Sequence, residues 1–352
     1  MRIAFRRAPV LAAALLALSL AACGSNATPA ASPSGSTESG NGPLVVYSGR
    51  DEKLVGPLIA QFEKDTGIKT EVRYAGSAAQ AQLLLTERDN SPAQVFLSQE
   101  SGALGLLAQA GLLGGLSETA LAKVPEAYRA ADKTWVGLTG RARVVAYDSS
   151  QVSVGEVPDT AAAMIDPKWK GQIGVTPGNA SFIAFVTAMR LTDGEAKTAQ
   201  WLKALADNGV KSYEKNSGIL QAVESGEIKL GLTNHYYWFS AAAEQGADNM
   251  RAKIKYGAPG DVAALVNVTG VGLLKKAAQN PNAQAFVDYL LSEAGQKYFV
   301  EKQFEYPLVP GVAGPQGVPE LASLQGPKID LSDLDSVEQS AKLIDEAGIS
   351  VG

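Results

Sequence analysis

The sequence predicts an α/β fold divided into two lobes. From residue 44 onward, short apolar runs alternate with segments of helical apolar spacing, in the order strand, helix, strand, helix, strand. That order is typical of a parallel sheet with helices on both faces. About 310 residues follow the polar segment that ends near residue 43, and a chain of this length suits two cores better than one.

The first lobe is expected to begin with three strands and two helices. Strands are predicted at 44–47, 69–74 and 94–97, and helices at 54–63 and 78–88. The polar loops 48–52 and 98–101 follow the first and third strands. Small ligands bind at the carboxyl ends of parallel strands, so these loops are candidate binding loops.

Two β-rich runs, 134–138 and 143–147, surround Gly140 and Arg141 and form the candidate connection between the lobes. Beyond them the pattern predicts strands and helices again, and then return strands near the end of the chain. The predicted strands are 172–175, 228–232 and those within 262–274, and the predicted helices are 159–165, 182–191, 195–206, 220–223, a pair within 281–303, and 335–346.

The loop 176–181 leads directly into the helix predicted at 182–191. Backbone amides and small hydroxyls at a helix N-terminus form a ready anion site. Asn179 and Ser181 are also typical of an ordinary capped turn, and Asn216 stands at a similar corner where capping is the usual role. The residues alone therefore leave anion binding and simple capping open.

Adjacent tyrosines, Tyr236 and Tyr237, follow the strand at 228–232 and precede the alanine-rich run 240–244. In a continuing strand their side chains would point to opposite faces, whereas at a strand-to-helix corner both phenols can converge. Phenols have a pKa near 10, and a hard trivalent cation can displace their protons and bind the phenolates. The pair therefore indicates a ferric site, and the alternative is a packed aromatic cluster.

The chain begins with a basic and then apolar segment, residues 1–22, that is typical of a secretory signal. It ends in Leu20-Ala21-Ala22-Cys23, which resembles a bacterial lipobox, so Cys23 is expected to carry a lipid. A plain signal peptide with an incidental cysteine is the alternative. Residues 23–43 are rich in Ser, Gly, Pro, Asn and Thr and predict a flexible tether. This arrangement would hold a domain at the outer face of a membrane.

Charge and motifs argue against several classes of function. Removal of residues 1–22 takes away three of the 31 basic residues and none of the 36 acidic ones, which leaves a formal net charge of −8. A mildly acidic domain without a basic block is a poor nucleic-acid binder. Cys23 is the only cysteine, and the sequence contains no nucleophile elbow, phosphate-binding glycine loop or Ser-His-acid spacing. An enzyme is therefore not expected.

Several segments together resemble one family, the bacterial ferric-ion-binding proteins, which are extracytoplasmic solute-binding components of iron ABC transporters. The resemblance runs from about Leu44 to the end of the chain. The segments that carry it are 46–50, 62–69, 110–113, 140–145, 167–171, 215–217, 234–238 and 305–308. The most specific is Asn-X-Tyr-Tyr-Trp at 234–238, in register with Lys-Asn-Ser at 215–217.

This resemblance implies a type II fold like that of periplasmic binding proteins, with hinge strands and a ligand cleft between the lobes. The expected lobes are 44–140 with about 267–317, and 141–266 with about 318–352. It also implies a monomeric lipoprotein that captures Fe³⁺, with phosphate or carbonate, and delivers it to a membrane permease. A protein of the same fold that binds another small ligand, such as a phosphonate, thiamine or a polyamine, is the alternative.

The resemblance also assigns residues. The family's iron-binding tyrosines fall on Tyr236 and Tyr237. Small polar residues that hold the anion fall on Asn179, Ala180 and Ser181, and further contacts match Asn216 and Asn234. Arg141 stands in a matching context, where an anion contact and a hinge salt bridge are equally open.

The departures from the family concern the first lobe. A histidine that coordinates iron in the best-known members is replaced by Asp51. The glutamate and neighbouring glutamine of those members occur in reversed order as Gln99 and Glu100. Asp51 and Glu100 can supply hard oxygen donors, or both can be solvated loop acids, and Gln99 is assigned to the anion. The only histidine, His235, lies beside the tyrosines and has no counterpart among the family's ligands.

Overall fold

The computed structural model describes residues 42–350, which fold around one eleven-stranded sheet. The predicted leader, Cys23 and nearly all of the predicted tether lie outside the described residues. The main path of the sheet runs in the order β2-β1-β3-β10-β5-β8-β6-β7. The strands are β1 (Leu44–Ser48), β2 (Thr70–Tyr74), β3 (Val95–Ser98), β4 (Leu113–Gly114), β5 (Trp135–Asp148), β6 (Ile173–Val175), β7 (Lys211–Ser212), β8 (Leu230–Asn234), β9 (Ala252–Tyr256), β10 (Val266–Leu274) and β11 (Tyr306–Pro307).

Helices cover the sheet and fill the connections. They are α1 (Glu52–Thr66), α2 (Ser77–Glu87), α3 (Ser101–Gln109), α4 (Glu118–Ala122), α5 (Ala161–Met164), α6 (Ala180–Asp193), α7 (Glu195–Asp207), α8 (Asn216–Glu224), α9 (His235–Gln245), α10 (Pro281–Leu290), α11 (Glu293–Gln303) and α12 (Val337–Glu346). Within residues 42–350, none of the helices has the length and apolar character that crossing a membrane requires.

The first half of the sheet has the predicted parallel core, because β1 pairs in parallel with both β2 and β3. Helix α1 shows how the sequence produces this half. Its apolar residues recur with helical spacing and are buried: Val55, Leu58, Ile59 and Phe62. The helix ends at Gly67, whose φ of 75° is the left-handed conformation that glycine adopts most easily. The chain is thereby turned back into β2.

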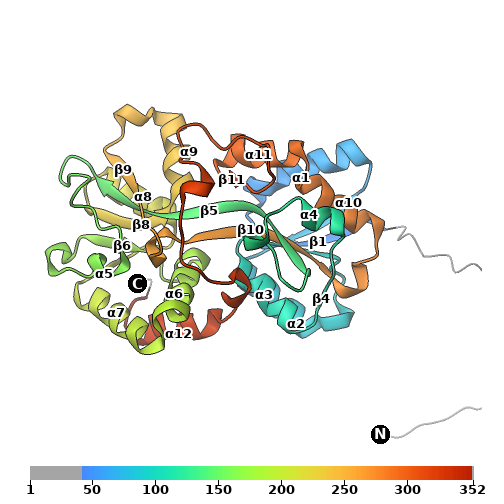
Figure 1. Ribbon diagram of the computed structural model, residues 1–352, viewed down its shortest axis with the longest axis horizontal. Helices are drawn as coiled ribbons and strands as arrows, with labels where there is room; N and C mark the ends of the chain where they lie inside the picture. The colour runs from blue at the N-terminus through green and yellow to red at the C-terminus, as the bar shows by residue number, and fades with distance from the viewer. Residues whose placement is uncertain (1–41, 351–352) are drawn as a thin grey trace, which may run out of the picture. The chain divides into compact units, whose positions relative to one another are not determined.

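A single strand of 14 residues, β5, joins the two halves of the sheet, and all of its residues are buried. Its first part pairs with β10, and from Arg143 onward it pairs with β8 and β9. The predicted runs 134–138 and 143–147 belong to this one strand, since Gly140 and Arg141 between them also pair with β10. Figure 1 shows β5 and β10 side by side across the middle of the fold.

In the second half, β6 lies parallel to β7 and β8. Helices α6, α8 and α9 directly follow β6, β7 and β8, so their N-termini lie at one edge of the sheet. The sequence predicts most of these elements with small shifts at their ends. It does not predict β9, and the helix expected at 159–165 contains only the four-residue α5.

After β10 the chain returns to the first half of the sheet. Helices α10 and α11 pack beside α1, and the rings of Phe62 and Phe286 meet edge to face with centroids 5.0 Å apart. The short strand β11 then pairs with β5 at Gly140 and Thr139. These contacts agree with a first lobe that includes residues from about 267 to 317, and the boundaries themselves stay a prediction.

The C-terminal segment 331–346 contacts both halves. At Gly105 of α3, an added Cβ would lie 2.1 Å from the carbonyl oxygen of Ser332, so the backbone approaches this helix very closely. Farther along, Ser340 of α12 shares a hydrogen bond of 2.8 Å with Thr187 of α6. The segment therefore links α3 of the first half to α6 of the second.

Candidate metal centre

The predicted corner is present where β8 ends and α9 begins. Tyr236 and Tyr237 lie in the first turn of α9, directly after the buried strand. Their rings are stacked, with centroids 4.4 Å apart and an interplanar angle of 30°. Tyr236 is buried and Tyr237 is partly buried. Successive side chains in a helix diverge by about 100° rather than the 180° of a strand, which lets both phenols face the same region.

The surroundings of the pair oppose the loss of a phenol proton in the absence of a cation. Burial raises the pKa of Tyr237 well above its usual range, and the adjacent Tyr236 raises it further. The positive charges of Arg141 and Arg50 act in the opposite direction. The phenol of Tyr237 therefore keeps its proton at neutral pH in the absence of a metal, and a bound cation is needed to convert it to a phenolate.

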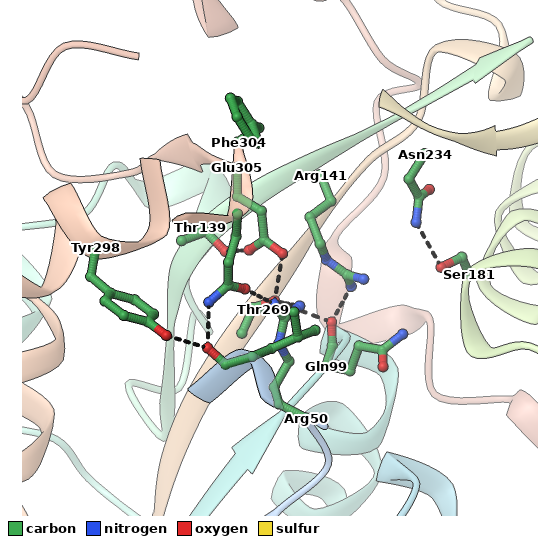
Figure 2. A network of polar contacts seen from close by, with 12 residues as sticks. Arg50, Gln99, Thr139, Arg141, Ser181, Asn234, Thr269, Tyr298, Phe304 and Glu305 are labelled. Carbon is green, nitrogen blue, oxygen red and sulfur yellow. Dashed lines mark hydrogen bonds and ion pairs between the residues drawn. The ribbon is translucent and has the colours of Figure 1, made fainter. Parts of the chain in front are cut away.

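Three buried arginines lie around the tyrosine pair: Arg50 at the end of β1, and Arg141 and Arg143 on β5. Arg50 forms an ion pair of 2.7 Å with Glu305 and donates to the Thr269 hydroxyl at 3.1 Å. Figure 2 shows this network. The carboxylate of Glu305 balances the charge of Arg50 inside the protein, where an unpaired charge would be costly.

Arg141 and Arg143 are less completely paired. One Nη of Arg141 donates to the carbonyl of Gln99, and Arg143 donates to the Asn234 side chain at 3.0 Å and to the Leu232 carbonyl at 3.2 Å. Within the described residues, Nε and Nη1 of Arg141 and Nε of Arg143 have no acceptor. Buried N–H groups are normally satisfied, so these three donors are available to an acceptor that enters the site.

Four of the predicted anion-binding residues are joined by hydrogen bonds at the N-termini of α6, α8 and α9. Asn234 donates to the Ser181 hydroxyl at 3.0 Å, as Figure 2 shows. Asn216 donates to the Asn179 side chain at 3.2 Å, and Asn179 accepts the backbone N–H of Ser181 as the cap of α6. Ala180 is the first residue of α6. The sequence therefore predicts a group of residues that the fold does bring together, and capping is part of their role.

The two predicted carboxylate ligands both cap helices. Asp51 is exposed, and its side chain accepts the Lys53 N–H at 2.9 Å at the start of α1. Glu100 is buried and accepts the N–H groups of Gly102 and Ala103 at 2.8 and 3.4 Å at the start of α3. Burial raises the pKa of Glu100, while Arg141 and these two backbone bonds lower it. Glu100 is thus close to Arg141, whereas the carboxylate of Asp51 is exposed at the start of α1.

A cavity of about 230 Å³ lies between the N-termini of α2, α3 and α6. Gln99 and Glu100 line it from the first half of the sheet, and Asn179 and Ala180 line it from the second. Predicted residues from both lobes therefore meet at one cavity. Among the described residues, no three His, Cys, Asp or Glu side chains gather as a metal-binding group.

Arg50, Arg143 and Glu305 were not predicted as site residues from the sequence. A signal for Arg143 was available, because Arg141 and Arg143 alternate within an apolar strand and must therefore point to the same face. Arg50 and Glu305 are 255 residues apart in the chain, and only the fold brings them into contact. No local pattern could have paired them.

Comparison with known proteins identifies the family. The family profile described as bacterial extracellular solute-binding protein matches residues 90–328. The major ferric iron-binding protein of Neisseria meningitidis serogroup B is 35% identical over 311 residues, which cover 87% of this chain and 93% of that protein. The chain belongs to the bacterial ferric-iron-binding proteins. As a member of this family it is an extracytoplasmic solute-binding protein and not an enzyme.

Other members of the ferric-iron-binding family show the same fold. The Fe(3+)-binding periplasmic protein of Serratia marcescens is 33% identical over 87% of this chain and 90% of its own length. Iron-bound HitA from Pseudomonas aeruginosa superposes with a TM-score of 0.81 at 32% identity, over 87% of this chain and 99% of that one. A Trichodesmium protein in complex with iron and citrate gives a TM-score of 0.74 at 26% identity, over 88% of this chain and all of that one (100%). The two-lobed architecture expected from the sequence is thus confirmed.

Proposed function

We propose that this protein captures ferric iron in the cleft between its lobes and that Tyr236 and Tyr237 coordinate the metal through their phenolate oxygens. The observation that carries the proposal is the stacked pair of phenols beside buried guanidinium groups. Fe³⁺ is a hard cation that prefers anionic oxygen, so it can displace the protons of two adjacent phenols and bind the phenolates. The Neisseria and Serratia relatives are named as ferric-iron-binding proteins, which supports Fe³⁺ as the ligand of this chain.

A small anion completes the site in this proposal. Two phenolates balance only part of the charge of Fe³⁺, and Arg141 and Arg143 add positive charge nearby. The unpaired N–H groups of these arginines are suitable donors to phosphate, carbonate or a carboxylate such as citrate. Asn179, Ala180, Ser181, Asn216 and Asn234 would bind the same anion from the N-termini of α6, α8 and α9, where the helix dipoles favour negative charge.

Carboxylates of the first lobe have a smaller part in this proposal. Glu100 and Gln99 line the cavity beside the anion residues, and Gln99 can donate its amide to the anion. Each carboxylate oxygen of Glu100 accepts one backbone N–H of α3 and keeps a second lone pair that could bind iron. Asp51 is exposed, and it can reach the metal only if the lobes close further.

Delivery follows from the two-lobed architecture. Donor groups on both lobes would bind the same metal only when the cleft is closed, and a membrane permease of the ABC type would recognise that form. Cys23 would carry a lipid that keeps the monomeric protein at the outer face of the cell membrane, with residues 23–43 as the tether. Mass spectrometry of membrane-extracted protein checks the anchor, since an unmodified Cys23 would contradict it.

Titration of the iron-free protein with chelated ferric iron tests the function. Binding should produce a visible absorption band from phenolate-to-iron charge transfer and a rise in melting temperature. The double variant Tyr236→Phe/Tyr237→Phe should lose the band and most of the iron affinity, because a phenyl ring has no oxygen to coordinate.

Tyr289→Phe is the matched control, because Tyr289 is also partly buried but lies on α10, where its hydroxyl donates to Asp65 of α1. It should bind iron like the original protein. A double variant that keeps the band would overturn the assignment of both tyrosines. A protein that instead binds a phosphonate, thiamine or a polyamine equally well with and without the two hydroxyls would favour a different cargo.

A further inference from the structure

His235 is the first residue of α9 and its side chain is fully buried, with 0% of its surface exposed. Both ring nitrogens have partners within the protein. The backbone N–H of Ala142 donates to Nδ1 at 3.2 Å, and Nε2 lies 2.9 Å from the carbonyl oxygen of Phe304. Since Nδ1 accepts, the proton of the neutral ring is on Nε2, which donates to Phe304.

These two hydrogen bonds connect elements that carry the metal centre. Ala142 lies on β5 between Arg141 and Arg143. Phe304 ends α11, has a left-handed φ of 56°, and immediately precedes Glu305, the partner of Arg50. The ring of His235 therefore bridges two parts of the centre. One is β5, which carries Arg141 and Arg143, and the other is the turn that carries Glu305, the partner of Arg50.

Aromatic contacts hold the same ring between two others. The imidazole is tilted by 31° against the ring of Tyr306, with centroids 4.8 Å apart. It meets the ring of Tyr236 edge on, at 5.8 Å and 89°. Because His235 directly precedes Tyr236 in the first turn of α9, any shift of the imidazole moves the phenols relative to β5.

From this geometry we infer that His235 is a positioning residue, which sets the distance between the two phenols and the arginines of β5 and is not itself a metal ligand. The inference rests on the proposed role of Tyr236 and Tyr237 in iron binding. Neither ring nitrogen can coordinate a metal without giving up a buried hydrogen bond, which would leave the N–H of Ala142 or the carbonyl of Phe304 unpaired. The unsatisfied backbone group opposes such a change.

The variant His235→Phe tests the inference, because it keeps a ring between Tyr306 and Tyr236 but removes both hydrogen bonds. We expect its iron affinity, measured by competition with citrate, to fall about tenfold or more, and its phenolate-to-iron band to shift in wavelength. His235→Gln retains a donor that can reach Phe304 and should restore part of both properties. It also provides the readout if the Phe variant does not fold.

Trp238→Phe is the matched control, since Trp238 also anchors α9 by one hydrogen bond, from Nε1 to the carbonyl of Ala252 on β9 at 2.6 Å. It should lower the melting temperature but leave the band in place. A band and affinity unchanged in both His235 variants would overturn the inference, as would nitrogen hyperfine coupling to bound iron in pulsed EPR. Absence of any band in the unmodified protein would instead refute the proposed function itself.

Discussion

The Nε and Nη1 atoms of Arg141 are buried donors without an acceptor among the described residues. An unsatisfied buried donor costs about 1–3 kcal/mol, and more when the group is charged. In the proposed function, the anion satisfies these donors. This makes Arg141 the residue at which the anion proposal is most directly tested.

We expect Arg141→Gln to weaken iron binding mainly when phosphate or carbonate is present, by about tenfold to a hundredfold, because charged hydrogen bonds contribute about 1.5–3 kcal/mol. Competition with a chelator, with and without the anion, measures this. Arg129→Gln is the control, since Arg129 pairs only with the exposed Glu126 and the Leu121 carbonyl. If Arg141→Gln keeps the full anion dependence, the anion binds elsewhere.

The residues of the metal centre differ in how well their roles could be predicted from the sequence. Tyr236 and Tyr237 are adjacent, and the corner that orients them follows from local apolar and alanine-rich patterns. Asp51 and Glu100 each precede a helical segment, and the sequence alone could not separate a capping carboxylate from a free one. The partnership of Arg50 with distant Glu305 depends on the finished fold.

At the level of elements, the corner between β8 and α9 depends on how closely α8 packs on β8. A Cβ added to Gly231 of β8 would lie 2.1 Å from Cγ2 of Ile219 on α8. A residue without a side chain is therefore required at this point of the strand. The same packing fixes the end of β8, from which the two tyrosines follow.

Gly231→Ala should lower the melting temperature by several degrees, because overpacking typically costs about 1–3 kcal/mol. The second change Ile219→Ala removes the clashing methyl group and should recover part of the loss, even though it deletes buried apolar volume. Thermal denaturation of both variants tests the prediction. An unaffected single variant would show that α8 can move away without cost.

Most elements were predictable because their apolar spacing is local. Helix α1, with Val55, Leu58, Ile59 and Phe62 on one face, is the clearest case. The connection between the halves was harder to predict. Gly140 and Arg141 interrupt the apolar pattern, yet both belong to the middle of β5, because pairing with β10 on a buried sheet outweighs their low strand propensity.

For the whole molecule, the segment 331–346 is a link between the halves in addition to β5 and β10. It depends on the absence of a side chain at Gly105, beside the Ser332 carbonyl. Gly105→Ala should therefore lower the melting temperature by a few degrees, despite the better helix propensity of alanine, because the segment must move off α3.

Gly115→Ala is the matched control, since a Cβ at this exposed position meets nothing within 4 Å. It should leave the melting temperature within about a degree of the original value, as surface changes usually do. Small-angle X-ray scattering of iron-loaded protein would then show whether Gly105→Ala also changes how far the lobes close. Equal melting temperatures for the two variants would contradict a tight contact at Gly105.

The course of β5 has a consequence for how such a protein can change over evolution. The strand that joins the two halves also carries Arg141 and Arg143, so in the proposed function anion binding and lobe closure would depend on the same few positions. A lineage that adopted a new companion anion through these arginines would alter its opening motion at the same time. We therefore expect anion selectivity and the opening motion of the lobes to diverge together among descendants of this chain.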